Sequence, residues 1–146
     1  MPYNGAKIER RTKYMIKETI TYVDYNGNER TEDLYFNLTK AEIMKMEMST
    51  KGGLAEMIQR VVQAQDQTAI IAIFEDLIHK SYGVKTPDGK GFRKTQADLD
   101  EFISTPAYSE LFMKLATDAD AASKFINGVV PADMAKQIAE QNGAKN

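Results

Sequence analysis

The chain contains no cysteine, no tryptophan and a single histidine among its 146 residues. The lack of cysteine excludes disulfides and thiolate metal sites, and one histidine excludes the histidine pair of common zinc sites. His79 leaves one candidate for the base of a Ser-His-Asp triad. It lies beside Lys80 near the predicted end of a helix, where a cation would face the last carbonyl groups. We therefore interpret His79 as a structural residue.

A large charge excess and a long apolar run are also missing. The 19 Lys and Arg residues nearly balance the 21 Asp and Glu residues, and the net charge is -2. This balance gives no general attraction to nucleic acid or to an anionic membrane. No apolar run approaches the roughly 20 residues that span a bilayer, and the first residues lack the pattern of a secretory signal. We expect no nucleic-acid partner, no membrane partner and a cytoplasmic protein.

The motifs of common catalytic and cofactor sites are absent as well. Residues 88–91 (DGKG) are rich in glycine, but they lack the Lys-Ser/Thr of a P-loop and the spacing of a Rossmann fingerprint. Asp118 and Asp120 lie at a predicted helix start, where carboxylates are ordinary, and lack the further ligands of a calcium loop. We predict no catalytic residue, no cofactor and no metal site, and therefore no enzyme.

Length and composition are those of an ordinary globular protein. Apolar residues make up 42% and charged residues 27% of the chain, which is enough for a core, and one domain over 1–146 is the default. Within it we expect a β-hairpin at 13–37 and a helical part at 39–141. The ends, 1–12 and 142–146, are predicted to be flexible.

Residues 18–43 specify a hairpin that runs directly into a helix. Asn26 and Gly27 place residues that tolerate a left-handed backbone at the turn. A two-residue loop would pair Tyr25 with Asn28, whereas a type I turn with Gly27 as the bulge residue would pair Asp24 with Asn28. These registers differ by one residue and would send opposite sets of side chains to the core.

The hydrophobic pattern favours the bulged register. It gathers apolar side chains on one face and leaves side chains that suit water on the other. Glu18 interrupts the apolar face. The apolar face comprises Ile16, Ile20, Tyr22, Leu34 and Phe36, and the polar face comprises Lys17, Thr19, Thr21, Glu29, Thr31 and Asp33.

Capping signals and apolar spacing divide the rest of the chain into short helices. Thr39 and Glu42 form a predicted capping box, with Leu38 and Ile43 as the hydrophobic staple, and residues 51–53 (KGG) break this first helix. The next helix is predicted at 54–65. The one after it starts at Asp66 or Thr68 and runs to Tyr82, with Gly83 as its C-cap, and we expect it to be the central buried helix. The remaining helices are predicted from Thr95 through Ile103, from Thr105-Pro106 through Leu115, from Asp118 to Asn127-Gly128 and, weakly, from Pro131 through Met134 and Ile138. The prediction is an α+β fold, predominantly α-helical, with an N-terminal β-hairpin packed on about five to seven short helices.

Methionine is concentrated around the first predicted helix, at Met44, Met46, Met48 and Met57. Its flexible, polarisable side chain suits surfaces that accept irregular apolar partners, so these four residues are candidate partner-binding residues. The alternative is that Met44 and Met48, which lie four residues apart, fill the core beneath the hairpin. Met46 falls off that stripe and is the one that we expect to be exposed.

The predicted loop at 85–94 (KTPDGKGFRK) is basic and contains Phe92 and Arg93. We interpret it first as a solvated loop and second as a partner contact, to which Phe92 and Arg93 would contribute. Nucleic-acid binding ranks third, because the chain as a whole is slightly acidic.

Three segments carry a family resemblance: YVDYNGNERTEDLYFNLTKAEI, STKGGLAEMI and AYSELFMKLATDADAASKFINGVVPADMA. Together they resemble tail assembly chaperones of siphophages that infect Gram-positive bacteria, over most of the chain from about residue 17 to residue 135. The resemblance implies a non-enzymatic chaperone that binds the tape measure protein, keeps it soluble and promotes tail tube assembly with the major tail protein. It also implies a protein of the host cytoplasm that is absent from the mature virion. Self-association stays an open alternative.

Two other classes of protein stay open at this stage. The first is a structural phage subunit of the tail or of the head–tail connector, which would remain in the finished particle. The second is an enzyme or regulator that holds a phosphorylated ligand with the basic loop at 85–94.

Overall fold

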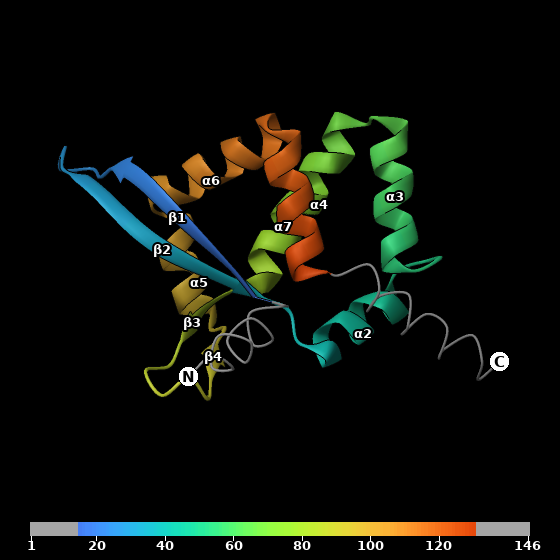
Figure 1. Cartoon of the computed structure of the whole chain (residues 1–146), viewed down its shortest axis with the longest axis horizontal. Helices are drawn as coiled ribbons and strands as arrows, with labels where there is room; N and C mark the ends of the chain where they lie inside the picture. Colours follow the sequence, from blue (N-terminus) through green and yellow to red (C-terminus); the bar gives the residue numbers. More distant parts are fainter. Residues whose placement is uncertain (1–14, 131–146) are drawn as a thin grey trace, which may run out of the picture.

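A β-hairpin followed by six helices forms most of residues 15–130, the part of the chain that the computed structural model describes (Figure 1). The prediction of an α+β fold dominated by helix is confirmed. The predicted flexible ends and the weak helix after Pro131 lie outside the described residues. In chain order the elements are β1 (Met15–Val23), β2 (Glu29–Asn37), α2 (Lys40–Ser49), α3 (Leu54–Ala64), α4 (Gln67–Ser81), β3 (Tyr82–Lys85), β4 (Phe92–Arg93), α5 (Gln96–Ile103), α6 (Pro106–Thr117) and α7 (Ala119–Val129).

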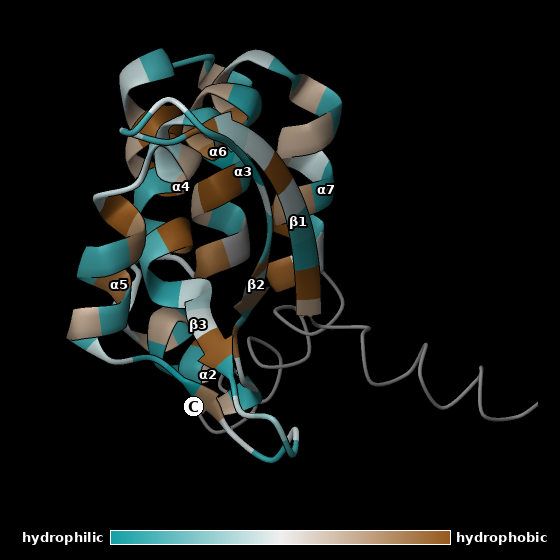
Figure 2. Ribbon diagram, turned by 90° about the vertical axis from the view of Figure 1, so that its left-hand side faces the viewer, coloured by the Kyte–Doolittle hydropathy of each residue, from teal (hydrophilic) through white to brown (hydrophobic). Residues whose placement is uncertain are grey.

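The hairpin adopts the bulged register. The backbone N–H of Asp24 donates to the carbonyl oxygen of Asn28 at 2.8 Å, and Gly27 has the positive φ, +86°, that the bulge position requires. Along the strands Ile16 pairs with Phe36, so the predicted apolar face is turned to the core. The resulting alternation of hydrophobic and hydrophilic residues is visible as bands along β1 (Figure 2).

Glu18, which breaks the apolar pattern of β1, has a partner. Its side chain is only 15% exposed, and Lys114 on α6 places its Nζ 3.4 Å from Oε2 of Glu18. β1 packs against α6 and α7, so a carboxylate on this face is accommodated by a cation from the covering helix.

The sheet has four strands, in the order β1-β2-β3-β4, and the sequence pattern reveals only the first two. We predicted a loop over the whole of 85–94 and a helix end at Gly83. Instead Gly83 pairs with Tyr35 of β2, and its φ lies outside the left-handed region that a glycine C-cap would adopt. A Cβ on Gly83 would overlap the ring of Phe92. Only the six residues between β3 and β4 form the expected loop. Strands of four and two residues are too short to show a two-residue hydrophobic period.

The predicted helix starts within residues 15–130 are confirmed, and a second predicted helix end, at Asn127-Gly128, is wrong. The complete capping box at Thr39 is present, and Asp66, Thr95 and Asp118 accept hydrogen bonds from the first turns of α4, α5 and α7. However, α7 continues through Gly128 to Val129. A Cβ on Gly128 would overlap the side chain of Ile16, so this glycine permits close contact between helix and strand and does not end the helix.

Phe36 lies at the centre of an aromatic cluster that joins the sheet to the helices. Its side chain is fully buried, and its ring centroid lies 5.8, 6.1 and 5.3 Å from those of Tyr82, Phe102 and Phe125. These rings come from β3, α5 and α7. α4 packs against α3, α6 and β2, but the prediction that it is the central buried helix is wrong, because one side of it, which includes Ile71, is exposed.

Glu47 connects α2 to α3 across the Gly52-Gly53 turn. It is buried, and both of its carboxylate oxygens accept from the backbone N–H of Leu54, at 3.0 and 3.1 Å. Leu54 is the first residue of α3, whose early N–H groups have no partner within the helix. A Cβ on Gly53 would overlap this carboxylate. The glutamate at the end of one helix therefore caps the next.

Replacing Glu47 with alanine is expected to lower the free energy of unfolding by about 1–2 kcal/mol, because it leaves the buried N–H of Leu54 without an acceptor. Urea unfolding would measure this change. Glu56→Ala provides a matched control, since Glu56 is an exposed glutamate in the first turn of α3, and should cost no more than about 0.5 kcal/mol. Equal losses in the two variants would contradict the capping role.

Candidate functional site

α2 presents two methionines to solvent. Met48 is 70% exposed and Met44 39% exposed, and residues four apart lie on the same side of a helix. We call these two residues the methionine pair. Both the prediction that Met46 is the exposed one and the alternative that Met44 and Met48 fill the core are wrong. Met46 is only 8% exposed, because the buried stripe of α2 consists of Ile43, Met46 and Glu47.

The other two groups of candidate residues are not as open. Met57 is partly buried and packs against the core from α3. Phe92 is also partly buried and lies against Gly83, whereas Arg93 is exposed at the end of β4. Of the six candidates, the structure therefore places Met44 and Met48 together on one helix, Phe92 and Arg93 together on a short strand, and Met46 and Met57 in or against the core.

The structure also exposes apolar side chains that sequence reasoning did not single out. Tyr25, beside the hairpin turn, is 83% exposed, and its neighbour Val23 is largely exposed. Figure 1 shows this turn at the far end of the hairpin, beyond the helices. Met113 on α6 is 55% exposed. The position of Tyr25 next to Asn26 was a usable signal, since side chains at a hairpin turn have little protein around them to pack against.

Three of the four cations of the basic loop interact with other parts of the chain. Arg93 donates through Nε to Asp98 at 2.9 Å. Lys94 donates through Nζ to Oε1 of Glu42 at 2.7 Å and to the carbonyl oxygen of Asn37 at 2.6 Å. Lys85 lies 5.0 Å from the centroid of the Tyr35 ring. These interactions fasten β3 and β4 to β2, α2 and α5. Lys90, in the loop between β3 and β4, is exposed.

Glu42 has a pKa below its ordinary value, and two opposing causes set it. Partial burial raises the pKa of Glu42, but hydrogen bonds from Lys94 and from the backbone N–H of Thr39 favour the charged form and outweigh burial. A carboxyl whose pKa is lowered by folding stabilises the fold above its unfolded pKa. That stability is lost as the pH falls through the folded pKa.

Acidification from about pH 6 to about pH 3 is therefore expected to destabilise the protein, and Lys94→Met should reduce the part of the loss that comes from Glu42. Urea midpoints measured across this range would test the expectation. Lys45→Met removes a charge of the same sign from an exposed position of α2 and should leave the pH profile as in the parent chain. A profile that is the same in the parent and in Lys94→Met would contradict this account of the Glu42 pKa.

His79, the remaining polar residue considered from the sequence, lies at a contact between two helices. His79 hydrogen-bonds through Nε2 to the hydroxyl of Tyr108 at 3.0 Å, which places it between α4 and α6. No group of three His, Asp or Glu side chains in this part of the chain is arranged to hold a metal ion. None of the described helices combines the length and the hydropathy needed to cross a membrane.

The fold and this surface place the chain in the class of small, mainly helical α+β proteins that carry exposed apolar side chains on a folded scaffold. A family model described as phage tail assembly chaperone matches residues 15–146. The chain therefore belongs to this phage tail assembly chaperone family, as the resemblance of its three segments indicated. No curated protein and no solved structure matches it.

Family membership restricts the role of the protein. A tail assembly chaperone has a non-catalytic role, and the family implies partners among the tail proteins of a phage. It also indicates an assembly factor that is not part of the virion.

Proposed function

We propose that this chain binds the tape measure protein of its phage, keeps it soluble and promotes assembly of the tail tube from the major tail protein. In this proposal the chain acts in the cytoplasm of the host bacterium and is released before the particle is complete. Membership of the tail assembly chaperone family supports an assembly role. The methionine pair supports a surface that accepts apolar segments.

The observation that carries the proposal is the exposure of Met44 and Met48 on one side of α2. A long helical protein presents apolar stripes that vary along its length, and flexible thioether side chains adapt to such stripes better than branched ones. Docking of an amphipathic helix against an apolar surface is a common mode of peptide recognition. The capping box at Thr39 and the hydrogen bonds from Leu54 to Glu47 hold α2 in place. Binding a partner on its exposed side would therefore cost little backbone conformational entropy.

Co-expression tests the proposal directly. The tape measure protein of the same phage should be insoluble when produced alone and should remain in the soluble fraction when this chain is produced with it. The two should then co-purify. A tape measure protein that aggregates equally with and without the chain would refute the proposal.

Mass spectrometry of purified virions separates this role from that of a structural tail or connector subunit. A chaperone should be missing from finished particles and present in the lysate before assembly. Recovery of the chain from virions in stoichiometric amounts would favour the structural subunit.

A further inference from the structure

The outer edge of β2 is open over most of its length. On one side β2 pairs with β1 along all nine of its residues. On the other side it pairs with β3 only at Tyr35 and Phe36. Within residues 15–130, no strand pairs with this side of β2 from Glu29 to Leu34.

The hairpin register shows which backbone groups lie along this edge. Asp24 donates its N–H to the carbonyl of Asn28, and residues of an antiparallel pair alternate between bonding to each other and pointing away. Arg30 and Glu32 therefore bond to β1, whereas Thr31 and Asp33 direct their N–H and C=O groups outward. Tyr35 is the next residue in the outward series, and it is the one that pairs with Gly83 of β3. The outward N–H and C=O groups of Thr31 and Asp33 are thus in line with those of Tyr35, but β3 does not pair with them.

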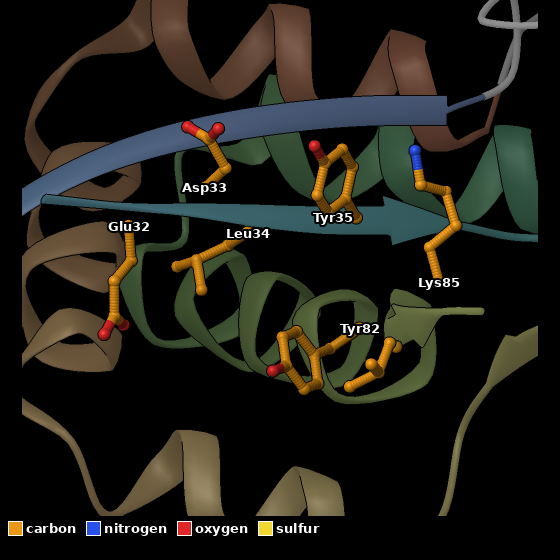
Figure 3. Close-up of a pocket in the computed structure, with 8 residues that line it drawn as sticks. Glu32, Asp33, Leu34, Tyr35, Tyr82 and Lys85 are labelled. Carbon is orange, nitrogen blue, oxygen red and sulfur yellow. The ribbon is translucent and has the colours of Figure 1, made fainter. Parts of the chain in front are cut away.

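A groove of about 390 Å³ lies where β3 diverges from β2. Its walls are residues 32–35 of β2 and 82–85 of β3. Figure 3 shows Asp33 and Tyr35 on one side of β2, with Glu32 and Tyr82 on the other. Val84 and Lys85 pair with β4 and do not pair with β2. The groove leaves space beside this part of the edge of β2.

Acidic residues surround the edge. Glu29, Glu32 and Asp33 all lie on β2. The pKa of Tyr82 is raised by burial and then by the nearby carboxylates of Asp98, Glu101 and Glu32. Asp98 is paired with Arg93, so Glu101 is the carboxylate of α5 that adds negative charge near the groove. Two basic residues lie in this region: Arg30 pairs with Asp24 at 2.6 Å, and Lys85, which lines the groove, lies over the Tyr35 ring.

We propose that the open edge of β2 binds an extended polypeptide segment of a partner protein, with lysine or arginine side chains at alternating positions. Backbone hydrogen bonds to Thr31 and Asp33 would add the segment to the sheet, as in other cases of strand addition. The basic side chains would lie near the carboxylates of β2 and α5. Pairing of two copies through this edge is disfavoured, because it would bring their acidic strands together.

This inference goes beyond the tape measure proposal. The edge runs toward the hairpin turn, at the end of the molecule opposite to α2 (Figure 1). It concerns a different surface and a different mode of recognition from the methionine pair. Its test uses a synthetic peptide, so either proposal can fail without the other.

Amide hydrogen exchange provides the first measurement, with a ten-residue peptide of alternating valine and lysine as the probe. In the free protein the amides of Thr31 and Asp33 should exchange faster than those of Arg30 and Glu32. The lysine peptide should protect Thr31 and Asp33, and a peptide with glutamate in place of lysine should not. Absence of protection by the lysine peptide, or equal protection by both peptides, would overturn the proposal.

Two proline variants separate this edge from the rest of the hairpin. Thr31→Pro removes the outward N–H of β2, and Thr21→Pro removes the outward N–H of β1 at the residue that pairs with Thr31. Both variants lose the same hydrogen bond between the two threonine hydroxyls, 2.9 Å long, and edge strands tolerate proline where the N–H faces outward. Thr31→Pro should bind the lysine peptide about tenfold more weakly than the parent chain, which corresponds to about 1.4 kcal/mol.

Thr21→Pro should bind the peptide as the parent chain does. Equal binding by the two variants would overturn the proposal. If Thr31→Pro fails to fold, the double variant Glu32→Lys/Asp33→Lys replaces it and should reverse the preference to the glutamate peptide. A double variant that still prefers the lysine peptide would also overturn the proposal. So would a parent chain that self-associates through this edge and does not bind the peptide.

Discussion

Replacing Phe36 with alanine is expected to lower the free energy of unfolding by about 3–5 kcal/mol, the range typical of a fully buried phenylalanine. The loss would come from the contacts of its ring with Tyr82, Phe102 and Phe125 and from the cavity left between the sheet and the helices. Small domains have only about 5–15 kcal/mol of stability in total. Chemical denaturation followed by circular dichroism would measure the change.

Tyr35→Ala is the matched control for this prediction. Tyr35 is the adjacent aromatic residue of the same strand, so its side chain points to the face opposite to that of Phe36. It is only partly buried, so its loss should cost clearly less than the loss of Phe36. Equal destabilisation by the two variants would show that the core is not centred on Phe36.

The double variant Met44→Ser/Met48→Ser is expected to weaken binding of the tape measure protein about a hundredfold, if each side chain contributes about 1.5 kcal/mol on burial. The variant should fold normally, because both residues are exposed and surface substitutions usually change stability by less than about 0.5 kcal/mol. Titration calorimetry with a soluble tape measure fragment would measure the affinity, and co-expression would show whether the full-length partner returns to the insoluble fraction.

Met113→Ser is the control for the methionine pair. Met113 is a methionine of comparable exposure, but it lies on α6 and not on α2. Its replacement should leave both affinity and solubility unchanged. If Met113→Ser weakens binding and the double variant does not, the contact surface lies on α6 and the assignment to α2 is wrong.

The hairpin and the helix starts could be predicted because local chemistry determines them. A turn that needs a left-handed residue at Gly27 and a cap that needs a hydroxyl at Thr39 leave few alternatives. β3 and β4 could not be predicted in the same way. They depend on the contact of Gly83 with Phe92 and on pairing with Tyr35, which is distant in sequence.

The exposed side of α2 was predicted wrongly, because Met46 was expected to face solvent and Met44 and Met48 do so instead. α2 has large apolar residues at four of its positions, Ile43, Met44, Met46 and Met48, and these support two different stripes. Spacing alone favours the stripe of Met44 and Met48, because the other stripe passes through Glu47 and a glutamate normally marks the solvent side of a helix. Glu47 is buried only because it caps α3. This contact depends on the fold around the Gly52-Gly53 turn and leaves no mark in the spacing of α2.

The contact between Gly128 and Ile16 has a consequence for how this chain can evolve. A glycine inside a helix costs about 1 kcal/mol relative to alanine, so replacement by alanine would ordinarily be an improvement. Here any side chain at position 128 meets Ile16 on β1. A larger residue at 128 therefore requires a smaller or displaced side chain at 16. Homologous chains should show this correlated substitution between the first strand and the last described helix.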